Sequence, residues 1–365
     1  MGTRPEAIKL APVAHALASR GVEPRLVFTG QHWGLEPWEF GLDEFAAVRL
    51  DCRGEENPHA HVGKVAAAFR SVLAKGPGLI VVQGDTSSAL GAALSAFQAG
   101  VPVAHVEAGL RTHDLRLPWP EEEYRTAIDA SAELLFAPTE QAAANLNREG
   151  VTGEIHVTGN TGIDAVLAVE ARLPAPVLSD NGGHRLLVTC HRRESWGEGL
   201  QAIARALRGL ASCGVRIDVM LHPNPYVAGR IRALLGGCRG ISLIDPCGHA
   251  ELVERMRSSD LVLSDSGGIQ EEAPTLGVPL LVLRDKTERP EGLAEGNALL
   301  VGTSAERIVE TVTRLLDDPV ERAAMSRRSF PYGDGHAAPR IAKLIGEWLE
   351  RRSAEADRIR QRAET

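Results

Sequence analysis

The sequence lacks the features that mark membrane, secreted and metal-binding proteins. Its five cysteines form no Cys-x-x-Cys pair, which excludes a disulfide framework and a cysteine zinc site, so we expect free thiols and no metal. The longest apolar runs, such as 79–82 and 280–283, are strand-sized and fall far short of the ~20 residues of a membrane span. Because the opening MGTRPEAIKL carries no apolar signal region, we expect a cytoplasmic protein without a membrane partner.

Positive charge is also scarce. The formal net charge of −8 argues against a nucleic-acid partner, whose binding domain would be basic. Only five of the 40 basic residues are lysine, so nearly every cation is an arginine, whose planar fork suits phosphates and carboxylates. The length of 365 residues predicts two domains, and 44% apolar residues are ordinary for a globular chain.

Short apolar runs alternate with helical patterns through most of the chain. This alternation is typical of βαβ units and predicts an α/β fold with parallel sheets. The first series of predicted strands is 25–28, 79–82, 101–106, 134–137 and 155–157. The second series is 186–189, 217–221, 241–244, 261–263, 280–283 and 298–301. We therefore expect two Rossmann-like domains.

Four segments are predicted from this pattern. Residues 1–172 form the N-terminal domain, whose first strand is missing because the chain opens directly on a Gly-Thr-Arg-Pro turn. Residues 173–184 are rich in turn formers and are predicted to be the linker. Residues 185–335 form the C-terminal domain, and 336–365 form a helix that returns toward the N-terminal domain.

Polar clusters follow the predicted strands at their carboxyl ends. They are 83–86, 107–111, 158–160, 191–194, 222–225, 265–268 and 284–289. Ligands of open parallel sheets bind outside these ends. We therefore expect the active site in a cleft between the two domains.

Several of these clusters suit a diphosphate. Glycines at Ser266-Gly267-Gly268 let backbone N–H groups approach a phosphate at a helix start, although the same residues could be a plain helix cap. Arg4 and Lys9 lie on a second such turn, where solvated charges are the simpler interpretation, and His191 with Arg192 belongs to a third cationic cluster.

Three carboxylates stand in the loops of the first domain. They are Asp85, Glu107 and Glu121. Carboxylates beside a diphosphate are expected to have raised pKa values, which suits general acid or base work near neutral pH. Singly each could be a capping or ion-paired acid; as a set they are the catalytic candidates.

With these residues in place, the chain resembles the non-hydrolysing UDP-N-acetylglucosamine 2-epimerases over nearly its whole length. The matching stretches are GTRPEAIKLAPV (2–13), TGQH (29–32), QGDT (83–86), HVEAGLRT (105–112), PWPEE (118–122), TGNTGIDA (158–165), HRRES (191–195), DSGGIQEEAPTLGVP (265–279), RDKTERPEG (284–292) and PYGDG (331–335). The resemblance implies two Rossmann-like domains in a glycosyltransferase-B arrangement. It also implies a homodimer that acts in cell-surface polysaccharide synthesis.

The resemblance implies that UDP-N-acetylglucosamine and UDP-N-acetylmannosamine interconvert by elimination of UDP to a 2-acetamidoglucal and re-addition, with no cofactor. Asp85, Glu107 and Glu121 are implied as acid/base groups, with the face that each serves left open, and His191 is implied to contact the leaving diphosphate. The remaining substrate ligands implied are Arg4, Lys9, Ser266, Gly267, Gly268, Glu272 for the ribose and Arg289.

The sequence departs from the family pattern in three places. Met1 stands where a hydrophobic first strand should end. The resemblance implies a site for a second, activating UDP-sugar at Gln31, His32, Arg192 and His222, although the sequence after TGQH differs from the family pattern. Pro246-Cys247-Gly248-His249 replaces the usual aromatic uracil loop, which predicts reshaped base contacts.

Other functions fit the same residues. A relative could hydrolyse the UDP-sugar, or epimerise a different UDP-2-acetamido sugar. A glycosyltransferase on this fold is disfavoured, because three carboxylates and the GTRPEA turn suit proton transfer without an acceptor. A protein of another class, a catalytically inactive UDP-sugar sensor, would bind UDP tightly and form no product.

Overall fold

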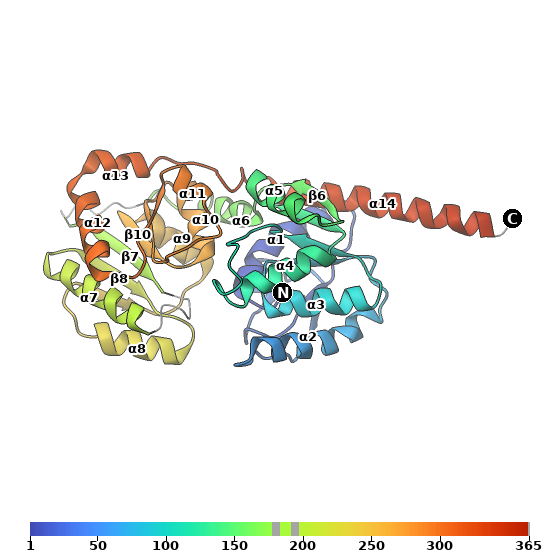
Figure 1. Ribbon diagram of the computed structural model, residues 1–365, viewed down its shortest axis with the longest axis horizontal. Coiled ribbons are helices and arrows are strands. Elements are labelled where there is room, and N and C mark those ends of the chain that lie inside the picture. The colour runs from blue at the N-terminus through green and yellow to red at the C-terminus, as the bar shows by residue number, and fades with distance from the viewer. Residues whose placement is uncertain (177–182, 191–196, 364–365) are drawn as a thin grey trace. The chain divides into compact units, whose positions relative to one another are not determined.

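The computed structural model describes residues 1–176, 183–190 and 197–363 (Figure 1). Contacts within the chain divide it into two units. Unit 1 comprises Met1–Ala165 and Tyr332–Thr365, and unit 2 comprises Val166–Pro331. Both units are built from parallel strands joined by helices, so the α/β class with two parallel-sheet units is confirmed.

The division between the two units falls within α6 (Thr161–Glu170). Val166 is buried in an apolar cluster of unit 2, and Leu167, Val169 and Leu173 pack against that cluster. The second half of α6 therefore groups with unit 2. The return to unit 1 at Tyr332 lies within a few residues of the sequence-based boundary at 335.

Unit 1 contains a four-stranded parallel sheet in the order β3-β4-β5-β6. Its strands are β3 (Ile80–Gln83), β4 (Val103–Val106), β5 (Leu134–Ala137) and β6 (Glu154–Val157). Every residue of β4 and β5 is buried, as expected where helices cover both faces of a parallel sheet. A separate two-stranded sheet pairs β1 (Leu26–Phe28) with β2 (Ala47–Arg49). Met1 lies beside β1, where its amino group donates to the Val27 carbonyl at 2.8 Å.

Local sequence sets the helices of unit 1. They are α1 (Arg4–Ala18), the short 3-10 helix η1 (Pro37–Phe40), α2 (Pro58–Leu73), α3 (Ser87–Gln98), α4 (Glu121–Ser131), α5 (Glu140–Glu149), the start of α6, and α14 (Ala337–Ala363). Thr139 caps α5 by accepting the Ala142 N–H at 3.1 Å, and Gly150 ends that helix in the left-handed conformation.

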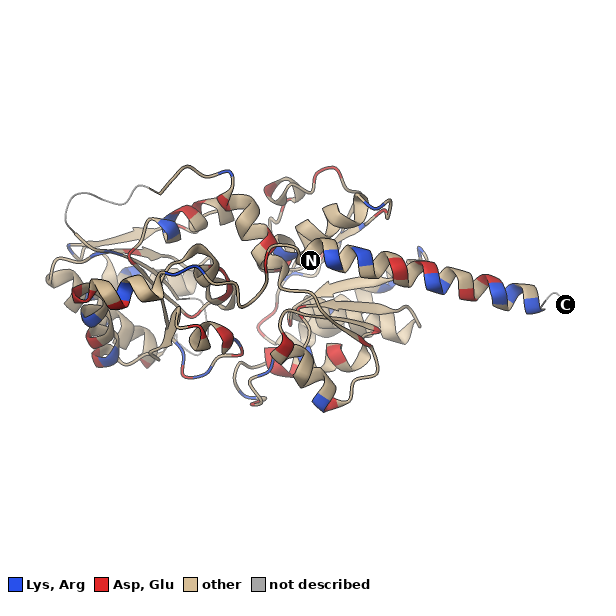
Figure 2. Ribbon diagram, turned by 90° about the horizontal axis from the view of Figure 1, so that it is seen from above, with Lys and Arg blue, Asp and Glu red and all other residues tan. Residues whose placement is uncertain are grey.

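Helix α14 belongs to the core of unit 1 over its first half only. Ile341, Ile345 and Trp348 are buried against Leu10 of α1 and Phe136 of β5. From residue 350 to 362 every side chain is exposed, and the helix runs on past the rest of the unit (Figure 1). Acidic and basic residues are interspersed along this stretch (Figure 2). No helix in the described part of the chain is long and apolar enough to cross a membrane.

Unit 2 is a six-stranded parallel sheet in the order β12-β11-β10-β7-β8-β9. Its strands are β7 (Arg185–Thr189), β8 (Arg216–Met220), β9 (Ile241–Ile244), β10 (Leu261–Ser264), β11 (Leu280–Val282) and β12 (Ala298–Leu300). Its described helices after α6 are α7 (Glu198–Ser212), α8 (Pro225–Leu235), α9 (His249–Arg257), α10 (Gly267–Leu276), α11 (Glu291–Ala294), α12 (Ala305–Asp317) and α13 (Pro319–Met325). The strand order reverses between β7 and β10, and ligands of such sheets bind at this point.

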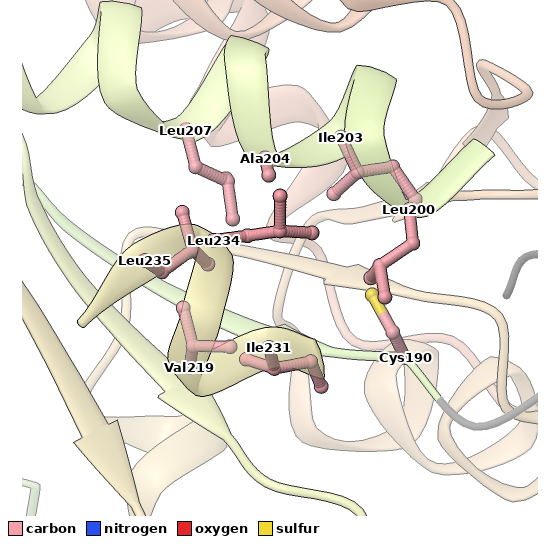
Figure 3. A pocket seen from close by; sticks show the side chains of 9 residues that line it. All are labelled: Cys190, Leu200, Ile203, Ala204, Leu207, Val219, Ile231, Leu234 and Leu235. Atoms are coloured by element: carbon pink, nitrogen blue, oxygen red, sulfur yellow. The ribbon is translucent and has the colours of Figure 1, made fainter. Parts of the chain in front are cut away.

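One small cavity lies in the core of unit 2, among Cys190, Leu200 and Ile203 and their apolar neighbours (Figure 3). Its volume of about 10 Å³ and its apolar lining leave no polar partner for a substrate. The candidate functional groups are the polar side chains at the carboxyl ends of the strands.

Candidate active site

Glu107 follows β4 at the carboxyl end of the unit 1 sheet and is buried. Its backbone is left-handed, with φ 70°, which is uncommon outside glycine and costs on the order of 1–3 kcal/mol. The Lys9 Nζ from α1 lies 2.6 Å from the Glu107 Oε2, and the Gln83 amide donates to the same oxygen. Lys9, predicted as a phosphate ligand, is thus ion-paired with a predicted acid/base group.

Asp85 follows β3, the neighbouring strand, so the carboxyl ends of β3 and β4 bring it to the same edge of the sheet as Glu107. Its carboxylate is ion-paired with Arg125 of α4 and keeps 29% of its side-chain surface exposed. Arg125 also contacts the Glu122 carboxylate at 3.1 Å. The exposure leaves Asp85 within reach of a ligand, while Arg125 fixes its direction.

Glu121 is the first residue of α4 and is half-buried. A helix start favours a carboxylate, because the backbone N–H groups there carry partial positive charge. The next residue, Glu122, accepts the N–H groups of Thr112 and His113 at 2.8 and 2.9 Å, which fastens α4 to the loop after Glu107. All three predicted carboxylates thus come from segments that hydrogen bonds or ion pairs join to one another.

Arg4 opens α1 and is partly exposed, but its guanidinium is paired with Glu39 of η1 at 2.6 Å. His32 lies next to it, since its Nδ1 accepts the Arg4 N–H at 3.4 Å. Gln31 accepts a hydrogen bond from the Ser88 hydroxyl at 2.7 Å. Arg4 and the two predicted activator residues of unit 1 therefore gather at the start of α1.

The predicted phosphate loop lies at the point of unit 2 where the strand order reverses. The Thr189 and Ser264 hydroxyls, at the ends of β7 and β10, are 2.6 Å apart, and Ser264 also accepts the Ser266 N–H at 3.0 Å. Helix α10 starts at Gly267, and the Ser266 side chain does not cap it. The first N–H groups of α10, at Gly267 and Gly268, thus form the kind of helix start that binds phosphate.

Arg289 packs against this helix start. A Cβ built on Gly267 would lie 2.8 Å from the Arg289 Cζ, so only glycine leaves room for the guanidinium. Arg289 is buried, with its Nε 2.6 Å from Glu271 and its Nη1 on Glu288. Arg284 pairs with the same Glu288 at 2.9 Å. Arg289 is thus held in place by the Glu271 and Glu288 carboxylates.

Glu272 lies on α10 with 9% of its side chain exposed. Its Oε1 is 3.1 Å from the His249 Nε2, while its buried Oε2 has no hydrogen-bond partner among the described residues. Burial lowers the pKa of His249, but the Glu272 carboxylate outweighs this effect and raises that pKa overall. Glu272 therefore presents a carboxylate with capacity for a hydroxyl donor.

The remaining predicted site residues belong to unit 2. His191 and Arg192 lie outside the described residues. His222 follows β8 and is half-buried, with its Nδ1 accepting the Asn224 N–H at 2.9 Å. In the described residues, no group of three or more metal-ligating side chains is gathered.

Sequence reasoning missed the partners that hold the predicted residues. Gln83, Arg125 and His249 contact Glu107, Asp85 and Glu272 respectively. His105 is bonded by both ring nitrogens, to Asp129 and to Gly84, a role beyond the local packing that its place in an apolar strand suggested. The sequence did mark two of these partners, because Gln83 and His105 are polar side chains inside buried strands.

Comparison with known proteins identifies the relatives of this chain. The family model described as UDP-N-acetylglucosamine 2-epimerase matches residues 15–346. The UDP-N-acetylglucosamine 2-epimerase of Escherichia coli K12 is 42% identical over 94% of this chain and 96% of that protein. The crystal structure of the Neisseria meningitidis UDP-GlcNAc 2-epimerase bound to UDP-GlcNAc is 36% identical, with TM-score 0.89 over 95% of this chain and 98% of that one. The S. aureus MnaA–UDP co-structure is 35% identical, with TM-score 0.85 over 96% and 95%.

Proposed function

The chain belongs to the UDP-N-acetylglucosamine 2-epimerase family, and we propose that it interconverts UDP-N-acetylglucosamine and UDP-N-acetylmannosamine. In the proposed reaction a base removes the C2 proton and the C1–O bond to UDP breaks. The products are UDP and a bound 2-acetamidoglucal. UDP then adds back at C1 while a proton reaches the opposite face of C2, so the net change is inversion at C2.

Unit 1 supplies the proton chemistry. We propose Asp85, Glu107 and Glu121 as the acid/base groups, because they are the carboxylates at adjoining strand and helix ends. A positioned acid or base contributes about 10²–10⁴-fold to a rate. The observation that carries the proposal is Glu107, a buried carboxylate in left-handed backbone that Lys9 and Gln83 hold from two sides.

Unit 2 supplies the UDP ligands. We propose that the N–H groups of Gly267 and Gly268, with Ser266 and Arg289, bind phosphate, and that Glu272 accepts hydrogen bonds from the ribose hydroxyls. The uncapped start of α10 and the open capacity of Glu272 support these roles. We propose Arg4 as a further phosphate ligand from unit 1 and His191 as a contact of the leaving diphosphate.

The test is solvent-deuterium exchange. Incubation with UDP-N-acetylglucosamine in deuterated water should label C2 of both epimers. Glu107→Gln and Glu121→Gln should stop this labelling, because an amide cannot take the C2 proton, while UDP binding persists. Labelling that continues unchanged in both variants would remove the acid/base assignment.

The same incubation separates the alternatives. Free N-acetylmannosamine with UDP would indicate a hydrolysing enzyme, and no label or product with tight UDP binding would indicate a sensor. Comparing other UDP-2-acetamido sugars as substrates tests the preferred sugar.

We also propose that the protein is a cytoplasmic homodimer that supplies cell-surface polysaccharide synthesis, with an activator site at Gln31, His32, Arg192 and His222. The free cysteines of the described residues suit a reducing compartment. Light scattering tests the dimer. The dependence of the rate on UDP-sugar concentration tests the activator site, because binding of a second UDP-sugar molecule should raise the rate.

A further inference from the structure

A buried histidine–carboxylate pair joins β4 to α4 in unit 1. His105 of β4 and Asp129 of α4 both have fully buried side chains, and the His105 Nδ1 is 2.6 Å from the Asp129 Oδ1. Placing two ionisable groups out of water costs free energy, and the cost is offset only when every polar atom finds a partner. The partners of this pair are therefore informative.

Both ring nitrogens of His105 have an acceptor. The Nε2 is 2.8 Å from the Gly84 carbonyl, which can only accept, so this nitrogen donates. Burial raises the pKa of Asp129, but His105 and Arg111 outweigh it and lower the pKa overall, so Asp129 is an ionised acceptor. His105 thus links the Gly84 carbonyl to the Asp129 carboxylate.

These bonds end in the three segments that carry the proposed acid/base groups. Gly84 immediately precedes Asp85. The second oxygen of Asp129 accepts the Gly109 N–H at 3.1 Å, two residues after Glu107. Asp129 itself lies on α4, the helix that Glu121 begins. One buried pair therefore connects the β3 loop, the β4 loop and α4.

The loop after Glu107 is also fixed on its far side. Arg111 contacts the same Asp129 oxygen at 2.8 Å and pairs with Glu149 of α5 at 2.6 Å. Gly109 has φ 83°, and a Cβ there would lie 2.3 Å from the Ala142 carbonyl oxygen of α5. The loop has no room to shift toward α5, so its position follows the His105–Asp129 pair.

We propose that His105 and Asp129 are positioning residues that set the spacing of Asp85, Glu107 and Glu121 for proton transfer at one carbon. The inference rests on the proposed epimerase function. It assigns to these two residues no contact with substrate. A reacting group misplaced by 1 Å loses about 100-fold in rate, which is the size of effect that positioning can control.

Three substitutions separate the two bonds. In His105→Gln the amide nitrogen can replace Nε2 and keep the bond to Gly84. In His105→Asn it can replace Nδ1 and keep the bond to Asp129. His105→Leu keeps neither. We expect kcat to fall by about 10-fold in each amide variant and by about 100-fold or more in His105→Leu, with KM and the Kd for UDP within about threefold of the parent.

The control is Ile345→Ala, which opens a cavity in the α14 part of the same unit and removes no hydrogen bond of the pair. All variants are assayed well below their unfolding midpoints with substrate deuterated at C2. If proton abstraction has become slower, the isotope effect on kcat rises in the His105 variants. Loss of folded protein alone leaves the isotope effect unchanged, as expected for Ile345→Ala.

Retention of kcat within threefold in all three variants, or a loss without any rise in the isotope effect, would overturn the inference. If the parent enzyme epimerises the substrate but the variants lack the expected fall in kcat or the rise in the isotope effect, the positioning role is wrong and the epimerase function stands. If the parent itself shows no C2 exchange and no product, both are wrong.

Discussion

At the scale of single residues, Gly267 shows how the absence of a side chain can shape a binding site. The Arg289 guanidinium occupies the space that a Cβ at Gly267 would need. A Cβ at the next residue, Gly268, would make only an ordinary van der Waals contact, with its nearest neighbour 3.9 Å away. The same methyl group added at two adjacent positions therefore meets different surroundings.

We expect Gly267→Ala to weaken UDP binding by about tenfold, equivalent to 1.4 kcal/mol, because Arg289 has to move away from the helix start. Gly268→Ala keeps its N–H group and should lose less. Titration calorimetry with UDP measures both. Equal losses in the two variants would contradict a role for the Arg289 contact.

The His249–Glu272 contact predicts a pH dependence. A histidine whose pKa is higher in the folded than in the unfolded state stabilises the fold fully below the unfolded value, about 6.5, and loses this effect as the pH rises through the folded value. Since the folded pKa of His249 is raised, its contribution is greatest in mild acid.

His249→Gln, which does not titrate, should therefore lower the Tm of unit 2 most below pH 6.5, by about 2–4 °C for a loss near 1 kcal/mol. The difference from the parent should shrink as the pH rises beyond the folded pKa. Thermal unfolding from pH 5.5 to 8.5 checks the sign. A gap that widens toward high pH would mean that the pair does not form as described.

At the scale of secondary-structure elements, the buried strands were the easiest to predict. Parallel strands covered on both faces give unbroken apolar runs, so every strand of the two predicted series is present, with ends within two residues. The missed strand, β2, has only three residues, two of them exposed, and carries no such run.

The site was predicted only in part because its positions and its partners have different origins. Asp85 and Glu107 follow strands and Glu272 lies in the helix that follows β10, and a sequence pattern marks those places. Their partners Arg125, Lys9 and His249 are 40, 98 and 23 residues away, a choice made by packing that no local pattern records.

The two halves of α14 should differ in how much they contribute to the stability of unit 1. Ending the chain at Ser353 removes only exposed turns and should change the Tm by less than about 2 °C, since the exposed ion pairs near the cut contribute about 0–1 kcal/mol. Trp348→Ala, which empties a buried position, should cost about 3–5 kcal/mol. Thermal unfolding of both variants measures this. A large loss on truncation would show that the exposed half of α14 also stabilises the unit.

At the scale of the whole molecule, the division into two units follows the apolar cores. Composition marks where a chain turns, whereas a unit is defined by which apolar side chains share a core. Val166 and Leu173, on either side of the predicted domain end, both belong with the core of unit 2.

The division also makes unit 1 discontinuous, since its core includes Ile341, Ile345 and Trp348 from the far end of the chain. A ribosome adds about 5–20 residues per second, and domains usually fold in the order of synthesis. Here unit 2 is complete once Pro331 has emerged, while unit 1 still lacks α14. The unit that begins first in the chain is therefore expected to finish folding last, because its apolar strands need a helix that is translated after the whole of unit 2.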